Sequence, residues 1–289
     1  MLRLIKAELF KLSKNKTLKI ICIVSICLSL LMLFMTTPAF EKVMEKAMQG
    51  IPAEQTEQMM SMLDSGEVVS QGSLGFTLNA KDPYNPTVSE VFHSAFGIGV
   101  IEVLVGIFIA AFLAKEYSEG TIKNTLAYGR KRSEVYLAKF VSIVVGIAMI
   151  LLALTIIPTV GSAIINGWGE TFEISQLVNL FATFIAALVA NAATAAIIMI
   201  IAIAVKSNGA TIGITFGVFS LLPMLISFLY GINNIFDKIY EITPWYNNQL
   251  ATSIYATNGD LVKSVIISII TMIIALFAGI QIFKKQDIK

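Results

Sequence analysis

Few side chains in this sequence have the types and spacing that catalysis requires. No stretch reads G-x-x-x-x-G-K-[ST], the loop that cradles ATP phosphates, and no nucleophile triad or pair of acids stands out. His93 is the only histidine, and we interpret it as an interfacial side chain rather than a base or a ligand. Cys22 and Cys27 fall in one apolar run, where they are expected to be small apolar fillers. The sequence therefore predicts no catalytic residue, no metal site, no enzyme activity and no cofactor bound by this chain.

One acidic residue, Glu102, is better placed for a binding role. It lies near the middle of an apolar run with glycines nearby. A carboxylate at the centre of a bilayer costs about 2.5–3.5 kcal/mol on an insertion scale unless it is protonated or faces a cavity. We interpret Glu102 as a contact that lines a translocation path, with Asn191 in a later apolar run as a weaker candidate for its partner. The alternative is a neutral, hydrogen-bonded packing residue.

The composition places these residues in a membrane protein. Hydrophobic residues make up 56% of the chain and charged residues 14%, and the mean hydropathy is +0.78. A soluble domain averages about 25% charged residues. The basic residues are scattered beside apolar runs instead of forming one contiguous face, so no nucleic-acid partner is indicated.

Six apolar runs are each long enough to cross about 30 Å of hydrocarbon as a helix. We predict an all-α integral membrane protein with a single transmembrane domain over 1–289. The predicted spans are 18–35, 91–114, 136–160, 177–205, 210–230 and 262–283. The segments 36–90 and 231–261 are predicted to be extracellular, and 115–135 is predicted to be a cytoplasmic loop.

The basic residues predict the orientation of these spans. Of the 21 Lys and Arg residues, five fall on the proposed outer side, at Lys42, Lys46, Lys81, Lys238 and Lys263. Lys and Arg concentrate in cytoplasmic segments, so both termini are expected inside the cell. The frequent Lys, Ile and Asn are compatible with a low-GC bacterium, and we expect a multi-pass protein of the bacterial plasma membrane.

Residues 1–17 show an amphipathic helical pattern. One face carries the apolar side chains Leu2, Ile5, Leu9 and Leu12, and Lys and Arg spread over the rest. Such a helix is typical of the membrane interface, with its apolar side in lipid. The alternative is a simple basic anchor ahead of the first span.

A ridge of small residues runs along the fifth predicted span at Gly209, Gly213 and Gly217. Small residues four apart allow helix backbones to approach closely. The ridge predicts tight helix packing, either within this subunit or against a second one.

The longest polar break between apolar runs, 115–139, predicts a short helix of its own. Ile122 and Leu126 are four apart and therefore share one helical face. Gly129 is a natural helix end, and the basic residues Arg130 to Arg132 follow at the negative end of the helix dipole.

The residues from Glu116 to Leu126, EYSEGTIKNTL, and the basic turn after them resemble the coupling segment of type-2 ABC exporter permease subunits. The resemblance implies a single permease domain whose coupling helix sits in a groove of a separate ATPase subunit, which binds ATP and Mg²⁺. The coupling residues that it implies are Glu116, Glu119, Gly120, Thr121, Ile122, Lys123, Leu126, Arg130 and Arg132. The alternative for this stretch is an ordinary basic loop with no partner.

The resemblance also implies partners and a class of substrate. It implies two permease subunits, identical or paired with a sister chain, and two ATPase subunits, which together export an antimicrobial peptide or another amphiphile. Two other classes stay open. One is a secondary transporter driven by an ion gradient, which should show inverted repeats or broken midplane helices. The other is a non-transporting membrane scaffold or sensor.

Overall fold

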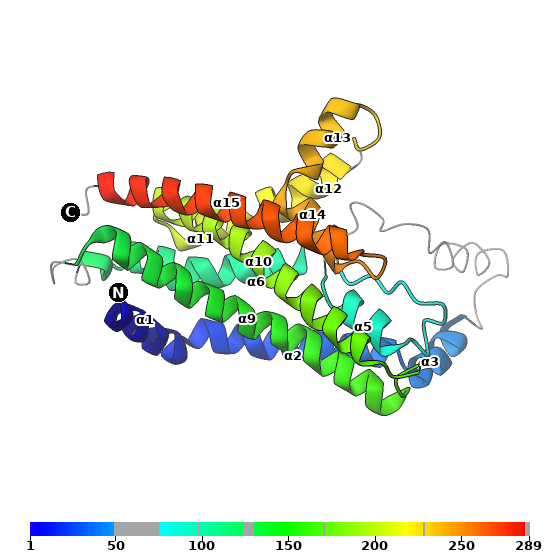
Figure 1. The fold of residues 1–289 in the computed structure, drawn as a ribbon. Helices are drawn as coiled ribbons and strands as arrows, with labels where there is room; N and C mark the ends of the chain where they lie inside the picture. The colour runs from blue at the N-terminus through cyan, green and yellow to red at the C-terminus, as the bar shows by residue number, and fades with distance from the viewer. Residues whose placement is uncertain (49–74, 98, 124–129, 170, 228, 287–289) are drawn as a thin grey trace.

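The computed structural model describes residues 1–48, 75–97, 99–123, 130–169, 171–227 and 229–286, and the elements in these ranges are helices (Figure 1). Five stretches are long and apolar enough to cross a membrane: α2 (Lys16–Met35), α9 (Arg132–Ile165), α10 (Ile174–Val205), the stretch Asn208–Ile226, and α15 (Asn258–Lys285). These helices confirm the all-helical class of the prediction and suggest a membrane-associated protein.

The fourth of these stretches is not a regular α-helix throughout. It consists of α11 (Asn208–Phe216), the π-helical turn η2 (Gly217–Leu221) and α12 (Leu222–Ser227). A π-turn inserts an extra residue into the helical repeat and shifts the faces on either side of it.

The second predicted span differs from the prediction, because 91–114 is not one helix. It is divided into α5 (Val88–Ser94), α6 (Val100–Ile109) and the π-turn η1 (Ala110–Ala114), and α7 (Lys115–Ser118) continues from η1. Gly99 precedes α6 with φ of +76°, a left-handed conformation that favours glycine. Hydropathy alone does not register this break, because both sides of it are apolar.

The interrupted segment still crosses the bundle from end to end. At one end the Val88 amide donates to the Trp168 carbonyl, just beyond the end of α9, at 3.3 Å. At the other end Glu116 lies 2.5 Å from Lys139, near the start of α9. Since α9 is one continuous helix between these contacts, the segment 88–118 runs the length of the bundle in the opposite direction.

Shorter helices accompany the long ones, and α1 (Leu2–Lys14) lies at the end of the bundle where α15 ends (Figure 1). α3 (Pro38–Met48) follows α2 at the other end, and α13 (Asn234–Glu241) and α14 (Pro244–Thr252) precede α15.

The sequence pattern predicted that the apolar face of α1 lies in lipid. In the structure, part of this face packs against the protein instead. Leu12 is buried in the main core, Leu9 packs against that core, and Leu2 is exposed. The inner side of α1 therefore rests on the protein itself, mainly on α9.

The core lies where α6, α9 and α10 meet, with Phe108, Ile147 and Met199 fully buried. A side chain at Gly146 on α9 would overlap the ring of Phe108. This glycine lets α9 approach α6 closely.

Among the residues that the structure describes, none packs against the glycine ridge of α11 and η2. A Cβ at Gly209, Gly213 or Gly217 would meet no described atom within 4 Å. The close small-residue contact is made instead by α10, whose Ala186 and Ala190 are buried and which packs along α15. Contact between the glycine ridge and a second subunit stays a prediction.

Candidate functional site

An ion network with a buried centre and an exposed edge joins α1, α7 and α9 at the end of the bundle where α1 lies. The Lys139 side chain is 1% exposed, and its ammonium lies 3.0 Å from Glu8 Oε2 and 2.5 Å from Glu116 Oε2. Lys11 closes the network, 2.8 Å from Glu8 Oε1 and 3.3 Å from Glu116 Oε1. Two ammonium groups thus balance two carboxylates, which is the condition for burying them at tolerable cost.

Local helix geometry points these side chains at one another. Glu8 is four residues from both Leu4 and Leu12, so it shares their inner face. Lys139 is three residues after Tyr136 and four before Ile143, both fully buried. The Lys139 ammonium also lies 5.7 Å from the centre of the Phe112 ring, a cation–π distance.

The sequence pattern assigned no role to Glu8, and it counted Lys139 only among the basic residues of the polar break. Their positions in the sequence could have identified them. Each charge lies at helical spacing among apolar residues, whereas a solvated loop charge lies among polar ones. Glu116 was predicted to contact a partner, but the structure places it in this internal network.

The network favours the charged forms of Glu8 and Lys11. Burial alone would raise the pKa of Glu8, but Lys139 and Lys11 outweigh burial and lower that pKa below its ordinary value. Burial alone would lower the pKa of Lys11, but Glu8 and Glu116 outweigh it and raise that pKa. The four charges therefore hold α1, α7 and α9 together through ion pairs.

Ile122 lies differently from its predicted role as an exposed anchor. Its side chain is 1% exposed and belongs to the chain's own core. Ile122 therefore packs under the protein's own helices. Leu126, its predicted companion, lies outside the described residues.

Arg132, also predicted to contact a partner, caps the last turn of α15. Its Nη1 donates to the carbonyl oxygens of Phe283, Lys284 and Gln286, at 3.2, 2.9 and 2.6 Å. A cation at the C-terminal end of a helix satisfies carbonyls that lack an intrahelical partner. Gln286 in turn donates to the Ile203 carbonyl of α10 at 2.7 Å, so Arg132 ties the start of α9 to α15 and α10.

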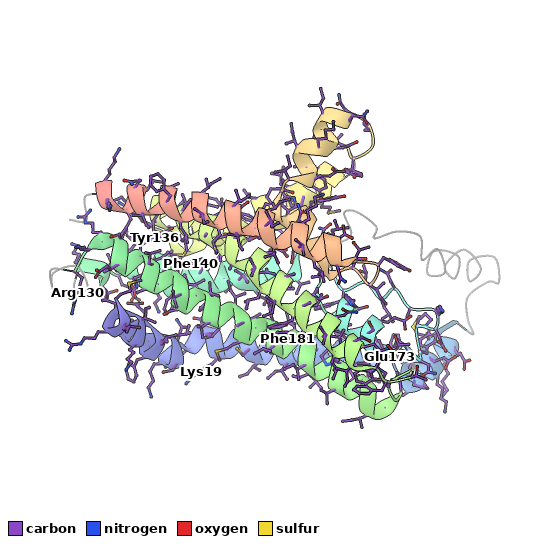
Figure 2. All side chains as sticks on the ribbon, in the orientation of Figure 1. Lys19, Arg130, Tyr136, Phe140, Glu173 and Phe181 are labelled. Carbon is purple, nitrogen blue, oxygen red and sulfur yellow. The ribbon has the colours of Figure 1, made fainter. Side chains whose placement is uncertain are left out.

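The other predicted coupling residues in the described part of this segment remain accessible. Glu119, Thr121, Lys123 and Arg130 are exposed, and Gly120 adopts a left-handed φ of +69° at the turn after α7. Figure 2 shows Arg130 at the same end of the bundle as α1. One side of the segment is thus fixed to the bundle, and the other side presents polar and charged groups.

Glu102 occupies the first turn of α6, just after the break in the segment. Its side chain is 8% exposed, and Oε2 has no hydrogen-bond partner in the described structure. The positive end of the α6 dipole favours a negative charge at this position. Glu102 is therefore a buried acid at a helix start with one oxygen still available to bind.

Asn191 does not hydrogen-bond to Glu102 in the described part of the chain. Its amide donates to the Ala187 carbonyl of its own helix at 2.9 Å. An apolar cavity of about 320 Å³ borders Gly99, Val103 and Ser220 beside the break, but Glu102 is not among its described lining residues. The structure therefore does not join the two predicted path residues.

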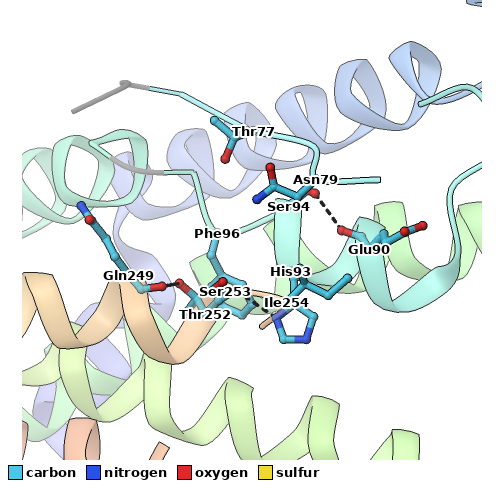
Figure 3. A pocket seen from close by; sticks show the side chains of 10 residues that line it. All are labelled: Thr77, Asn79, Glu90, His93, Ser94, Phe96, Gln249, Thr252, Ser253 and Ile254. Carbon is cyan, nitrogen blue, oxygen red and sulfur yellow. Dashed lines mark hydrogen bonds between the residues drawn. The ribbon is translucent and has the colours of Figure 1, made fainter. Parts of the chain in front are cut away.

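The opposite end of the bundle holds a small polar pocket of about 40 Å³ (Figure 3). His93 Nδ1 lies 2.9 Å from the Thr252 carbonyl, an arrangement in which Nδ1 carries the proton. Glu90 closes a capping box at the start of α5 by accepting from the Thr87 amide at 2.7 Å. Both side chains fix helix ends, so His93 ties α5 to the end of α14.

These features define a helical, membrane-type protein whose charged network binds a polar loop to the bundle. The chain belongs to the family described as "Protein of unknown function (DUF2705)", whose model matches residues 57–289. Glu116 and Lys139 fall inside the matched region, whereas Glu8 and Lys11 precede it. No curated protein and no solved structure matches the chain.

Proposed function

We propose that this chain is the permease subunit of an ATP-driven type-2 ABC exporter. In this proposal it has six spans, with both termini in the cytoplasm of a bacterium. The second of these spans is formed by the interrupted helices from α5 to α7, which join the five continuous stretches and whose contacts lie at opposite ends of the bundle. The observation that carries the proposal is the segment after α7, which is anchored through Glu116 and exposes Glu119, Thr121 and Lys123.

This arrangement suits force transfer. A displacement of the loop by an ATPase would act through Glu116 on Lys139 at the base of α9 and on Lys11 of α1. α9 is a continuous helix of 34 residues, about 50 Å long at ~1.5 Å per residue. Movement at its base would therefore reach the far end of the bundle. ATP and Mg²⁺ would bind the ATPase, and this chain would supply the path for an antimicrobial peptide or another amphiphile.

A second candidate is a secondary transporter that works on an ion gradient. The break before α6 favours it, because such transporters bind ions and substrates at interrupted helices near the membrane midplane. Glu102, buried at the start of α6 with an unpartnered oxygen, is the residue that such a site would use.

Purification of the full-length chain from native membranes separates the two. The exporter proposal predicts a co-purifying ATPase whose yield falls at least tenfold with Lys123→Glu but not with Lys6→Glu, a matched exposed charge on α1. Absence of any ATPase, with transport that stops when the ion gradient is collapsed while ATP is maintained, would overturn the exporter proposal in favour of the second candidate.

A further inference from the structure

An open apolar groove of about 430 Å³ lies at the junction of α1, α2 and α9, and the ion network does not use it. Seven apolar or weakly polar side chains line it: Leu9, Leu12, Leu18, Cys22, Ile23, Val145 and Met149. Its remaining lining residues are Ser13 and Lys19. It is thus a mostly hydrocarbon-like groove with one cationic side chain at its edge.

The groove exists because α1 and α2 do not form one straight helix. Asn15 between them is extended, with φ of −70° and ψ of 114°, and its side chain caps α2 by accepting from the Leu18 amide at 2.9 Å. The two helices therefore diverge, and Val145 and Met149 of α9 face the space between them. Figure 2 places Lys19 near the start of α2, close to this junction.

The lining selects an elongated apolar ligand with an anionic end. None of the described residues that line the groove is acidic, and the acid of α1, Glu8, is already bound to Lys139 and Lys11. Lys19 and the nearby Lys16 are exposed and take part in no ion pair within the described residues. Apolar walls suit an acyl chain, and free lysines at a membrane surface attract anionic headgroups.

We infer that this groove is a binding site for an anionic phospholipid, with one acyl chain between α1, α2 and α9 and the phosphate at Lys19. Leu9 and Leu12, which line the groove, lie on the same helix as Glu8 and Lys11 of the ion network. A bound lipid therefore supports the docking of α1 on α9, whatever the protein transports.

The experiment compares phosphatidylglycerol with phosphatidylcholine on the purified full-length chain in neutral detergent. Native mass spectrometry counts retained lipids, and thermal unfolding reports the gain in stability. We expect phosphatidylglycerol to bind about fivefold more tightly, and Lys19→Gln to remove that preference, since one lysine near an anionic surface contributes about that factor.

A larger side chain that fills the groove tests whether an acyl chain binds there. Met149→Trp should abolish retention of both lipids, and the partly exposed position of Met149 leaves room for the larger ring outside the core. Val145→Phe is the second variant if Met149→Trp does not fold. The matched controls are Ile20→Trp, exposed on α2 outside the groove, and Lys6→Gln, exposed on α1 outside the groove. Neither control should change binding.

Two results would overturn the inference. Equal binding of both lipids by the unaltered chain and by Lys19→Gln would remove the headgroup site. Unchanged retention in a folded groove-filling variant would remove the acyl-chain site. ATPase co-purification is a separate readout, so failure of the lipid site and failure of the proposed function are distinguishable.

Discussion

The ammonium of Lys139 lies 3.0 Å from Glu8 Oε2, although the two residues are 131 positions apart in the chain. The contact is buried on both sides. It joins the helix that precedes the first span to the base of the longest helix, and Glu116 brings the polar loop to the same point.

The first prediction concerns loss of the central cation. Lys139→Met removes the buried cation between Glu8 and Glu116 and leaves them only the exposed Lys11, so the free energy of unfolding should fall by about 3–5 kcal/mol. Sodium dodecyl sulfate titration of the purified protein measures this change. In a double-mutant cycle with Glu8→Gln, the coupling energy should be about 1–3 kcal/mol. Lys6→Met, at an exposed position, is the control, and a loss of similar size there would contradict a specific role for the network.

The second prediction is a pH window for the docking of α1. The pKa of Glu8 is lowered from its ordinary 4.5, so its contribution is complete above that value and is lost as pH falls through the lower folded-state pKa. The pKa of Lys11 is raised from its ordinary 10.5, so its contribution is complete below that value and is lost as pH rises through the higher folded-state pKa.

Cysteine accessibility at position 12, in a variant without Cys22 and Cys27, reports that docking. Labelling should stay low between the two limits and rise beyond them, and Glu8→Gln should remove the acid limb. An acid limb that is unchanged in Glu8→Gln would mean that another group controls the release of α1.

The third prediction concerns the cap on α15. Arg132→Ala removes three donated hydrogen bonds to helix-end carbonyls, and bonds from charged groups are worth about 1.5–3 kcal/mol. The last turn of α15 should therefore exchange its amide hydrogens faster, whereas Arg130→Ala, at an exposed position, should leave that exchange unchanged. Equal exchange in both variants would show that Arg132 does not hold this helix end.

The fourth prediction separates packing from partner binding in the loop. Ile122→Asp places an unpaired charge in the core and should destabilise the protein by more than about 4 kcal/mol. Ile122→Val should cost about 0.5–1.5 kcal/mol. Lys123→Glu, at an exposed position, should stay within about 0.5 kcal/mol and act only on a partner. If Ile122→Asp is stable and loses only its bound ATPase, the prediction is wrong and Ile122 contacts the ATPase.

Apolar runs in the sequence were enough to predict an all-helical membrane-type protein and the approximate limits of α2, α9, α10 and α15. Such runs carry this information because a helix of about 20 apolar residues satisfies its own backbone hydrogen bonds, so its limits depend on local composition. The start of α5 likewise follows Thr87, which caps the helix locally, and the basic Lys284 and Lys285 lie in the last turn of α15.

Tertiary structure alone decided the roles of the charged residues. Glu8, Glu116 and Lys139 lie in separate parts of the sequence, and they pair only because three separate helices meet at one point. The sequence around Arg132 is equally compatible with a solvent-exposed side chain. Only the position of the α15 end beside Arg132 makes it a helix cap. The energy of a buried charge depends on what surrounds it in space, which neighbours in the sequence do not specify.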